Sequence, residues 1–374
     1  DPDMASMIHN EMRKHGIKLV LGYTVEGFKE KDNGVEVLLK DNPSLQADMV
    51  VLAIGVTPDT ALAKEAGLEL GIKGSIVVND RMETSVPDIY AAGDAVQVKH
   101  YVTGNDALIS LAGPANKQGR IIADNICGGD SRYLGSQGSS VIKVFDMTAA
   151  TTGINETNAK KSGLEVDTVI LSPMSHAGYY PGGKVMTMKV VFEKETYRLL
   201  GAQIIGYEGV DKRIDVLATA IHAGLKATQL KDLDLAYAPP YSSAKDPVNM
   251  AGFMIDNIAK GTLKQWHLED MDKISRDKSV VLLDVRTVGE FNRGHMDGFK
   301  NIPVDELRER INEIEKGKPV YLICQSGLRS YIASRILEGN GYETYNFSGG
   351  FRFYDAVAND HALIERSYAC GMDY

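Results

Sequence analysis

The chain of 374 residues is poor in the features that mark several special classes of protein. Its three cysteines, Cys127, Cys324 and Cys370, lie far apart and form no C-x-x-C pair, so neither a disulfide framework nor a zinc site is indicated. No apolar run approaches the roughly 20 residues that span a bilayer, and the first residues do not resemble a signal peptide. The net charge of −9 argues against nucleic acid as the main partner. We therefore expect a cytoplasmic protein with no metal, membrane or nucleic-acid partner.

The last hundred or so residues alternate apolar strands with helices. Strands are predicted over 280–285, 319–324 and 343–346, and helices over 306–315 and 328–337. This alternation predicts the α/β class, with helices packed on a parallel sheet that places ligands at the carboxyl ends of its strands.

The preceding part of the chain mixes apolar alternation with shorter helical patterns. The predicted helices cover 116–126, 211–222 and 249–259. Strands are predicted over 17–21, 35–39, 49–54, 75–78, 89–94, 141–144, 168–171, 185–192 and 199–205.

The most informative stretch is YLICQSGLRS, residues 321–330, where an apolar strand ends at Cys324. The loop amides and the following helix N-terminus favour a thiolate, and Arg329 adds positive charge nearby. The thiolate is the form that attacks sulfur. A buried structural cysteine is the alternative, but the polar loop favours a nucleophile. The predicted cradle around the sulfur consists of Gln325, Ser326, Gly327, Leu328 and Ser330.

Further motifs flank this loop, namely LLDVR at 282–286, EF at 290–291, GH at 294–295, NIP at 301–303 and SGGF at 348–351. Over about 275–358 the chain therefore resembles a rhodanese domain. The resemblance implies that Cys324 accepts a sulfane sulfur as a persulfide and passes it on. Only four residues separate Cys324 from Arg329, a shorter loop than that of related phosphatases, which suits one sulfur atom better than a phosphate. Asp284, Arg286 and Glu290 are expected to brace the fold by salt bridges.

Three upstream stretches carry a second resemblance, VLAIGVTP at 51–58, TSVPDIYAAGD at 84–94 and LAGPANKQGR at 111–120. Residues 1–258 resemble the C-terminal part of a pyridine nucleotide-disulfide oxidoreductase. That family uses FAD and NADH, and the resemblance implies that Asp94 bonds a ribityl hydroxyl of FAD. A carboxylate after a glycine is a fair acceptor for such a group. The cofactor-binding residues so implied are Gly55, Gly93, Asp94, Leu111 and Ala112.

Within that family, an attached rhodanese domain points to the coenzyme A-disulfide reductase group, which includes NADH-dependent persulfide and polysulfide reductases. HAGYYPG at 176–182 and LAYAPPY at 235–241 resemble its dimerisation domain. The resemblance implies a homodimer in which Tyr179 and Tyr237 approach the partner's active site. Interface or core packing is the alternative role for these tyrosines.

The glycine-rich G-x-G-x-x-G loop that cradles FAD or NADH pyrophosphate is absent, as is the family's redox cysteine. We therefore expect a chain that lacks the first flavin half and binds neither cofactor tightly by itself. The expected division is a partial NAD(P)H-binding domain (1–57), the C-terminal part of an FAD-binding domain (58–129), an α+β dimerisation domain (130–260), a linker (261–270) and an α/β rhodanese domain (271–374).

The predicted activity of the parent enzyme is FAD- and NADH-dependent reduction of coenzyme A disulfides, persulfides or polysulfides. Coenzyme A or another small thiol persulfide is the expected partner, and Cys324 carries the sulfane sulfur. Two alternatives stay open at this point. One is an NADH oxidase or peroxidase, and the other is a dimeric scaffold whose rhodanese unit binds sulfur without turnover.

Overall fold

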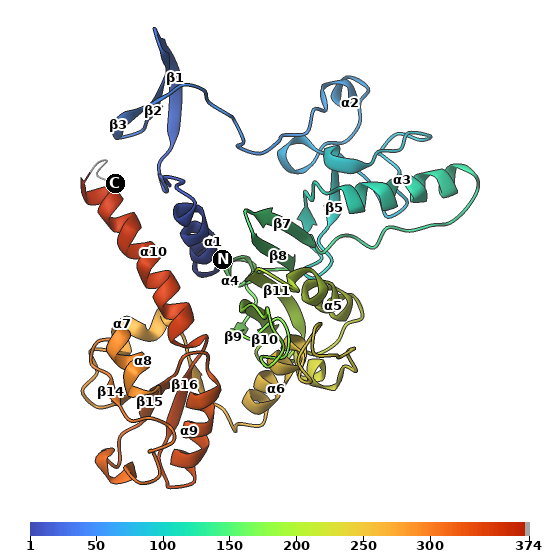
Figure 1. The fold of residues 1–374 in the computed structure, drawn as a ribbon. Coiled ribbons are helices and arrows are strands. Elements are labelled where there is room, and N and C mark those ends of the chain that lie inside the picture. The colour runs from blue at the N-terminus through green and yellow to red at the C-terminus, as the bar shows by residue number, and fades with distance from the viewer. Residues whose placement is uncertain (371–374) are drawn as a thin grey trace. The chain divides into compact units, whose positions relative to one another are not determined.

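A computed structural model describes residues 1–370 of the chain. Two compact units are present (Figure 1). One is formed by Asp1–Glu11 together with Val141–Asp360, and the other by Met12–Ser140 with the helical residues from His361 onward. The boundaries predicted at residues 57, 129, 260 and 270 remain predictions.

The unit built around Met12–Ser140 contains two small sheets. The antiparallel sheet β1-β2-β3 and the sheet β4-β5-β6 each have three strands, and a cluster of Met82, Val96 and Val98 packs beside the second. The elements are β1 (Val25–Lys31), β2 (Gly34–Leu39), β3 (Asn42–Ala47), α2 (Ala61–Glu65), η1 (Ile72–Gly74), β4 (Ile76–Val77), η2 (Gly93–Ala95), β5 (Val96–Lys99), β6 (Asp106–Ala107) and α3 (Ala112–Ile126).

The other unit begins with an antiparallel sheet in the order β7-β8-β11-β10-β9. Strands β10 and β11 are almost fully buried, since helix α5 covers one face of the sheet and α6 also packs on it. The elements are α1 (Pro2–Lys14), β7 (Ser140–Val144), β8 (Met147–Gly153), α4 (Glu156–Lys161), β9 (Val166–Leu171), β10 (Met186–Glu193), β11 (Leu199–Gly206), α5 (Val210–His222), η3 (Ala227–Asp232) and α6 (Pro247–Ala259).

The same unit continues into a five-stranded parallel sheet in the order β12-β16-β15-β13-β14. Alternation along β15 sends Leu322 into a cluster with α9 on one face and Ile323 into an aromatic cluster with α7 and α8 on the other. The elements are β12 (Gln265–Trp266), η4 (Leu268–Asp270), α7 (Met271–Ile274), β13 (Val281–Asp284), α8 (Val288–Arg293), β14 (Lys300–Asn301), η5 (Ile311–Glu313), β15 (Val320–Ile323), α9 (Leu328–Glu338), β16 (Thr344–Phe347) and α10 (Gly350–Cys370).

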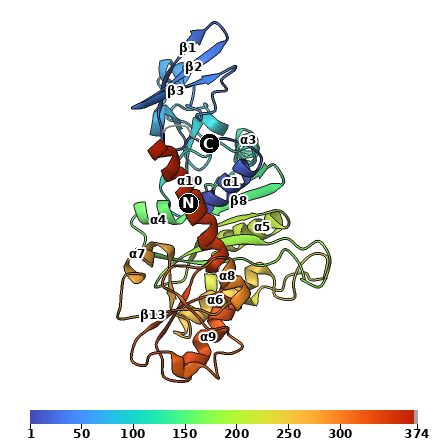
Figure 2. The ribbon, with the colours of Figure 1, turned by 60° about the vertical axis from the view of Figure 1, so that its left-hand side comes forward.

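The two sheets of this unit are joined by apolar packing. Phe353 and Val357 of α10 lie in one cluster with Ile170 of β9 and Met4 of α1. Helices α1 and α10 run side by side (Figures 1 and 2). The side-chain amide of Asn10 in α1 donates a hydrogen bond to the carbonyl of Ala356 in α10. The antiparallel sheet therefore packs on α1 and on α10, the helix that follows the last strand of the parallel sheet.

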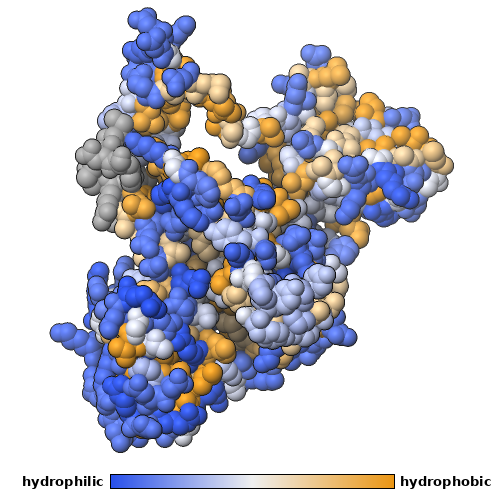
Figure 3. All heavy atoms as spheres, in the orientation of Figure 1, coloured by the Kyte–Doolittle hydropathy of each residue, from blue (hydrophilic) through white to orange (hydrophobic). Residues whose placement is uncertain are grey.

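Several predicted elements are wrong. Residues 306–315 form turns and η5 instead of a helix, and residues 17–21, 49–54 and 89–94 form no strand. The apolar segment between β3 and α2 is largely exposed, with Ile54 90% exposed, and shows as mostly orange spheres in Figure 3. An apolar run becomes a strand only where a neighbour accepts its hydrogen bonds, and no strand among residues 1–370 pairs with this segment.

The segment expected as a linker also carries regular structure. Gln265 and Trp266 form β12, which pairs in parallel with β16, and the Trp266 side chain is buried in the aromatic cluster. The parallel sheet therefore begins before residue 271.

Candidate functional site

Cys324 lies directly after β15, a central strand of the parallel sheet, and four residues before α9 begins at Leu328. The amide of Gly327 donates a hydrogen bond of 3.1 Å to Cys324 Sγ, and the hydroxyl of Ser330 donates one of 3.2 Å to the same sulfur. Donors aimed at a sulfur favour its anion, and so does the N-terminus of α9. The loop therefore presents Cys324 in a setting that stabilises a thiolate.

Gly327 is held in place by side chains that bond its carbonyl. Asn346 Nδ2 donates to it over 3.2 Å, and the Ser330 hydroxyl, whose single proton is shared with Cys324 Sγ, lies 3.1 Å from it. Gly327 takes φ of +98°, a left-handed conformation in which its amide turns toward Cys324. Asn346 was missed by the sequence analysis, and the only signal for it was a polar residue within an apolar strand.

The backbone of the sulfur loop is clamped by the start of α10. The amide of Phe351 donates to the carbonyl of Cys324 over 2.8 Å, and the amide of Arg352 donates to the carbonyl of Gln325 over 3.2 Å. Gly350 packs so closely that a Cβ atom there would lie 2.7 Å from the Ser326 nitrogen. The position of the cysteine is therefore fixed from two sides.

Arg329 does not supply a free positive charge. Its guanidinium makes two hydrogen bonds of 2.7 Å with the carboxylate of Glu290. These bonds lower the pKa of Glu290 to about 2. The same bonds are the main cause of the raised pKa of Arg329. The positive charge expected beside the cysteine is therefore present, but it is paired with the Glu290 carboxylate.

Arg286 is buried and joins the sulfur loop to its surroundings. It bonds both carboxylate oxygens of Asp284, the shortest contact being 2.6 Å, and reaches the side chain of Gln325 over 3.4 Å. Its guanidinium also lies 3.8 Å from the ring centre of Phe351. The expected bracing role of Asp284, Arg286 and Glu290 is confirmed.

The remaining predicted cradle residues differ in exposure. Gln325 and Ser326 are half-buried within the loop, whereas the side chain of Leu328 is 66% exposed. Cys324 itself is only 1% exposed. Leu328 therefore presents an apolar surface at the start of α9, above a largely covered thiol.

The structure brings Tyr179 and Tyr237 together, although 58 residues separate them in the chain. Their hydroxyls form a hydrogen bond of 2.6 Å, which raises the pKa of Tyr237. Both rings are exposed, Tyr179 by 76%. A pair of hydroxyls on the surface of the antiparallel-sheet domain suits contact with another molecule better than core packing.

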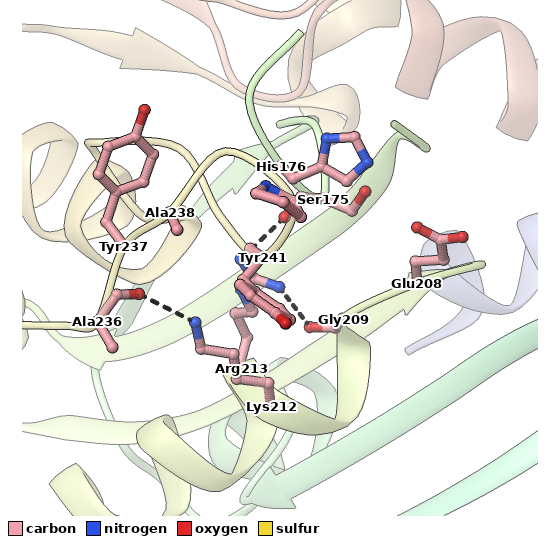
Figure 4. A pocket seen from close by; sticks show the side chains of 11 residues that line it. Ser175, His176, Glu208, Gly209, Lys212, Arg213, Ala236, Tyr237, Ala238 and Tyr241 are labelled. Carbon is pink, nitrogen blue, oxygen red and sulfur yellow. Dashed lines mark hydrogen bonds between the residues drawn. The ribbon is translucent and has the colours of Figure 1, made fainter. Parts of the chain in front are cut away.

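A cavity of about 510 Å³ lies beside Tyr237, between the start of α5 and the segment 236–241 (Figure 4). Its wall includes Arg213, whose buried guanidinium bonds the Asp246 carboxylate over 3.0 Å and the carbonyl of Ser175 over 2.9 Å. Lys212 reaches the carbonyl of Ala236 over 3.4 Å. The sequence analysis missed these residues, because the partners of Arg213 come from distant segments.

The residues implied for cofactor binding lie in the other unit. Asp94 is exposed on η2, and the neighbouring Gly93 amide donates over 2.7 Å to Gln118 of α3. Leu111, the N-cap of α3, makes no capping bond through its side chain, so the first amides of the helix at Ala112 stay available to an acceptor. Gly55 lies apart in the irregular segment between β3 and α2, with φ of +91°.

These residues fit part of a flavin nucleotide. The exposed carboxylate of Asp94 can accept a hydrogen bond from a sugar-chain hydroxyl, and the uncapped start of α3 can donate to a carbonyl oxygen or an anion. Residues 1–370 hold no G-x-G-x-x-G loop for a pyrophosphate. These residues therefore fit the flavin ring and its sugar chain, and not the pyrophosphate of the cofactor.

The described residues form neither a metal site nor a membrane-spanning helix. No group of three or more His, Cys, Asp or Glu side chains among them could hold a metal ion. Within the same residues, no helix is long and apolar enough to cross a membrane.

Three family descriptions match the chain in succession. Residues 1–119 match "Pyridine nucleotide-disulphide oxidoreductase", residues 139–247 match the dimerisation domain of that family, and residues 267–356 match "Rhodanese-like domain". The chain belongs to the pyridine nucleotide-disulphide oxidoreductase family and carries a rhodanese-like domain after the dimerisation domain. The α/β fold class predicted from the sequence is confirmed.

Similar proteins combine the same domains. The chain is 46% identical to the reduced Bacillus anthracis CoADR-RHD, with a TM-score of 0.93 over 96% of this chain and 64% of that one. It is 40% identical to an NAD-dependent persulfide reductase from A. fulgidus, with a TM-score of 0.87 over 95% and 65%. It is also 37% identical over 248 residues to a CoA-dependent NAD(P)H sulfur oxidoreductase of Pyrococcus abyssi, covering 66% of this chain and 55% of that protein.

The chain spans about half the length of the curated relatives it matches.

Proposed function

We propose that this chain is part of an NAD(P)H- and FAD-dependent reductase of coenzyme A disulfides, persulfides or polysulfides, in which Cys324 carries sulfane sulfur. The observation that supports the sulfur step is the pair of hydrogen bonds from Gly327 and Ser330 to Cys324 Sγ. The similarity to a persulfide reductase and a sulfur oxidoreductase supports the reductase part.

In the proposed sulfur step the Cys324 thiolate attacks the outer sulfur of a persulfide R–S–S–H. The S–S bond of the donor breaks, a new S–S bond forms on Cys324, and R–S⁻ leaves. A nucleophile such as cyanide then takes the outer sulfur as thiocyanate and restores the thiolate. The sum is a transfer of sulfane sulfur that requires no electrons from elsewhere. The Gly327 and Ser330 donors stabilise the thiolate at the start and the end of this cycle.

The charges around the loop favour an organic persulfide over thiosulfate as donor. Arg329 is paired with Glu290, and Arg286 with Asp284, so these two guanidinium groups already have a carboxylate each. A thiosulfate dianion would need an unpaired cation to offset its desolvation. A persulfide with one exposed sulfur needs no such partner, and the exposed Leu328 offers apolar contact to the rest of the donor.

The other proposed roles follow the family. FAD, when bound, supplies the two-electron redox chemistry of these enzymes. Asp94 would hold a hydroxyl of its sugar chain, and the start of α3 at Leu111 and Ala112 would face the flavin ring. In a homodimer, the hydroxyl pair of Tyr179 and Tyr237 would face coenzyme A at the partner's reaction centre.

The test of the sulfur step is the intact mass of the purified chain after incubation with glutathione persulfide. We expect one added sulfur atom in the wild type and in Cys127→Ala, whose cysteine is exposed, and none in Cys324→Ala. Rapid loss of the added mass with cyanide would identify it as sulfane sulfur. An addition that survives Cys324→Ala, or no addition to the wild type, would favour a dimeric scaffold without turnover.

A further inference from the structure

Strand β9 is an edge of the antiparallel sheet, so its outward amides and carbonyls need partners other than a strand. The rhodanese-like domain supplies them with side chains. Ser348 Oγ accepts a hydrogen bond of 3.0 Å from the Ile170 amide, and Gln265 Nε2 donates one of 2.8 Å to the Thr168 carbonyl. The bond between Ser348 and Ile170 is buried, so water cannot replace it without cost.

The segment that begins at Ser348 also holds the sulfur loop. Three residues further on, the Phe351 amide donates to the Cys324 carbonyl over 2.8 Å. Between them Gly350, with φ of +70°, lies against the backbone of Gln325 and Ser326 at distances that leave no room for a side chain. Since three residues span at most about 11 Å, an anchor at Ser348 limits how far Phe351 can move.

Apolar packing also connects strand β9 to the sulfur loop. Ile170 of β9 is buried against Phe353 and Val357 of α10, the helix whose first turn clamps the sulfur loop. A displacement of β9 would therefore reach the loop through both the hydroxyl bond and the helix. Among the described residues, no comparable bond ties the dimerisation sheet to the middle of α9, where Ser334 bonds the Tyr331 carbonyl of its own helix.

We infer that Ser348 is a positioning residue for sulfur transfer at Cys324, because it fixes to strand β9 the segment whose backbone holds the cysteine loop. The inference rests on the proposed sulfur-carrying role of Cys324. In this arrangement the dimerisation sheet sets the geometry of the sulfur site. The rhodanese-like domain keeps a fixed position relative to that sheet and does not carry sulfur by moving on a flexible linker.

The test compares Ser348→Ala with Ser348→Thr, which keeps the hydroxyl, and with Ser334→Ala, which removes an equally buried hydroxyl from the same domain. Transfer of sulfur from glutathione persulfide to cyanide is measured with each full-length variant. We expect kcat to fall about tenfold in Ser348→Ala with little change in KM for the persulfide. Ser348→Thr should recover most of the loss, and Ser334→Ala should match the wild type.

Hydrogen exchange of the peptide 349–353 gives a second readout that does not depend on turnover. It should rise in Ser348→Ala while exchange in the α9 peptide stays unchanged. Wild-type kcat and exchange in Ser348→Ala, or an equal loss in Ser334→Ala, would overturn the inference. A wild type that transfers no sulfur would instead refute the proposed function on which the inference depends.

Discussion

Glu290 of α8 and Arg329 of α9 form a two-point ion pair, with both hydrogen bonds 2.7 Å long, directly beside the sulfur loop. The two residues lie 39 positions apart and reach each other over the carboxyl edge of the parallel sheet. The pair holds the arginine next to the cysteine and cancels its charge at the same time.

The first prediction concerns donor choice. Glu290→Gln leaves Arg329 as an unpaired cation, so we expect the ratio of thiosulfate to glutathione-persulfide turnover to rise about tenfold, the gain of one charge-assisted contact. Glu313→Gln breaks a similar pair with Arg310 in the same domain, away from the cysteine, and should leave the ratio unchanged. An unchanged ratio in Glu290→Gln would show that charge does not select the donor.

The same ion pair makes stability depend on acid. Hydrogen bonds from Arg329 lower the pKa of Glu290 from 4.5 to about 2. A depressed carboxyl pKa means that the stabilisation is complete above pH 4.5 and is lost as the pH falls toward 2. The difference in free energy of unfolding between wild type and Glu290→Gln should therefore shrink over that window. Urea unfolding at a series of pH values measures it, and a difference that is constant with pH would contradict the assignment.

Ser330 is predicted to tune the reactivity of the cysteine. Ser330→Ala removes one of two hydrogen bonds to Cys324 Sγ while leaving the Gly327 amide in place. Alkylation of Cys324 by iodoacetamide should then slow several-fold, since a donor to sulfur favours the reactive thiolate. Ser334→Ala, one turn further along α9, serves as the control. Equal alkylation profiles for the two variants would remove Ser330 from the site.

The close packing at Gly350 predicts a large effect of one methyl group. Gly350→Ala places a Cβ 2.7 Å from the Ser326 nitrogen at φ of +70°, whereas Gly341→Ala meets only the backbone strain at φ of +83°. We expect Gly341→Ala to cost about 1 kcal/mol of stability and Gly350→Ala about 3 kcal/mol. Only Gly350→Ala should also abolish sulfur uptake. Thermal unfolding and intact mass measure both, and equal costs would contradict the packing argument.

The tyrosine pair predicts a change in ionisation. The hydrogen bond from Tyr179 raises the pKa of Tyr237. In Tyr179→Phe that pKa should fall toward the ordinary value of about 10, which an ultraviolet titration of tyrosinate detects. Tyr241→Phe removes a neighbouring exposed tyrosine without touching the pair and should leave the ionisation of Tyr237 unchanged. A raised pKa that persists in Tyr179→Phe would mean that the hydroxyls do not pair in solution.

Local patterns in the sequence predicted what depends on neighbours along the chain. The apolar strand ending at Cys324, the glycine at 327 and the helix from Leu328 were all expected and all form. Each is set within ten residues by alternation, by a positive φ that favours glycine and by helical periodicity. The salt bridge between Asp284 and Arg286 was predicted in the same way, because the two residues lie only two positions apart in the chain.

Residues 306–315 show the limit of such reasoning. Their charged pairs at helical spacing form, as between Arg310 and Glu306, and Leu307 and Ile314 are buried on one side as in an amphipathic helix. The backbone nevertheless makes turns and η5, because amides such as those of Leu307 and Ile314 bond the carbonyl three residues back and not four. The predicted strand over 49–54 failed because nothing among residues 1–370 pairs with it.

The sequence by itself determined the succession of domains and the family, and it predicted Cys324 as the nucleophile, because these depend on residues adjacent in the chain. Only the tertiary structure decided which carboxylate pairs with the arginine beside the cysteine, and how the segment that holds the sulfur loop is attached to the dimerisation sheet. Arg329, expected to add positive charge beside the cysteine, is paired with Glu290, and Ser348 is anchored by Ile170 of the dimerisation sheet. Ion pairs and edge-strand bonds act over a few ångströms of space, and the chain brings their partners that close only when it folds.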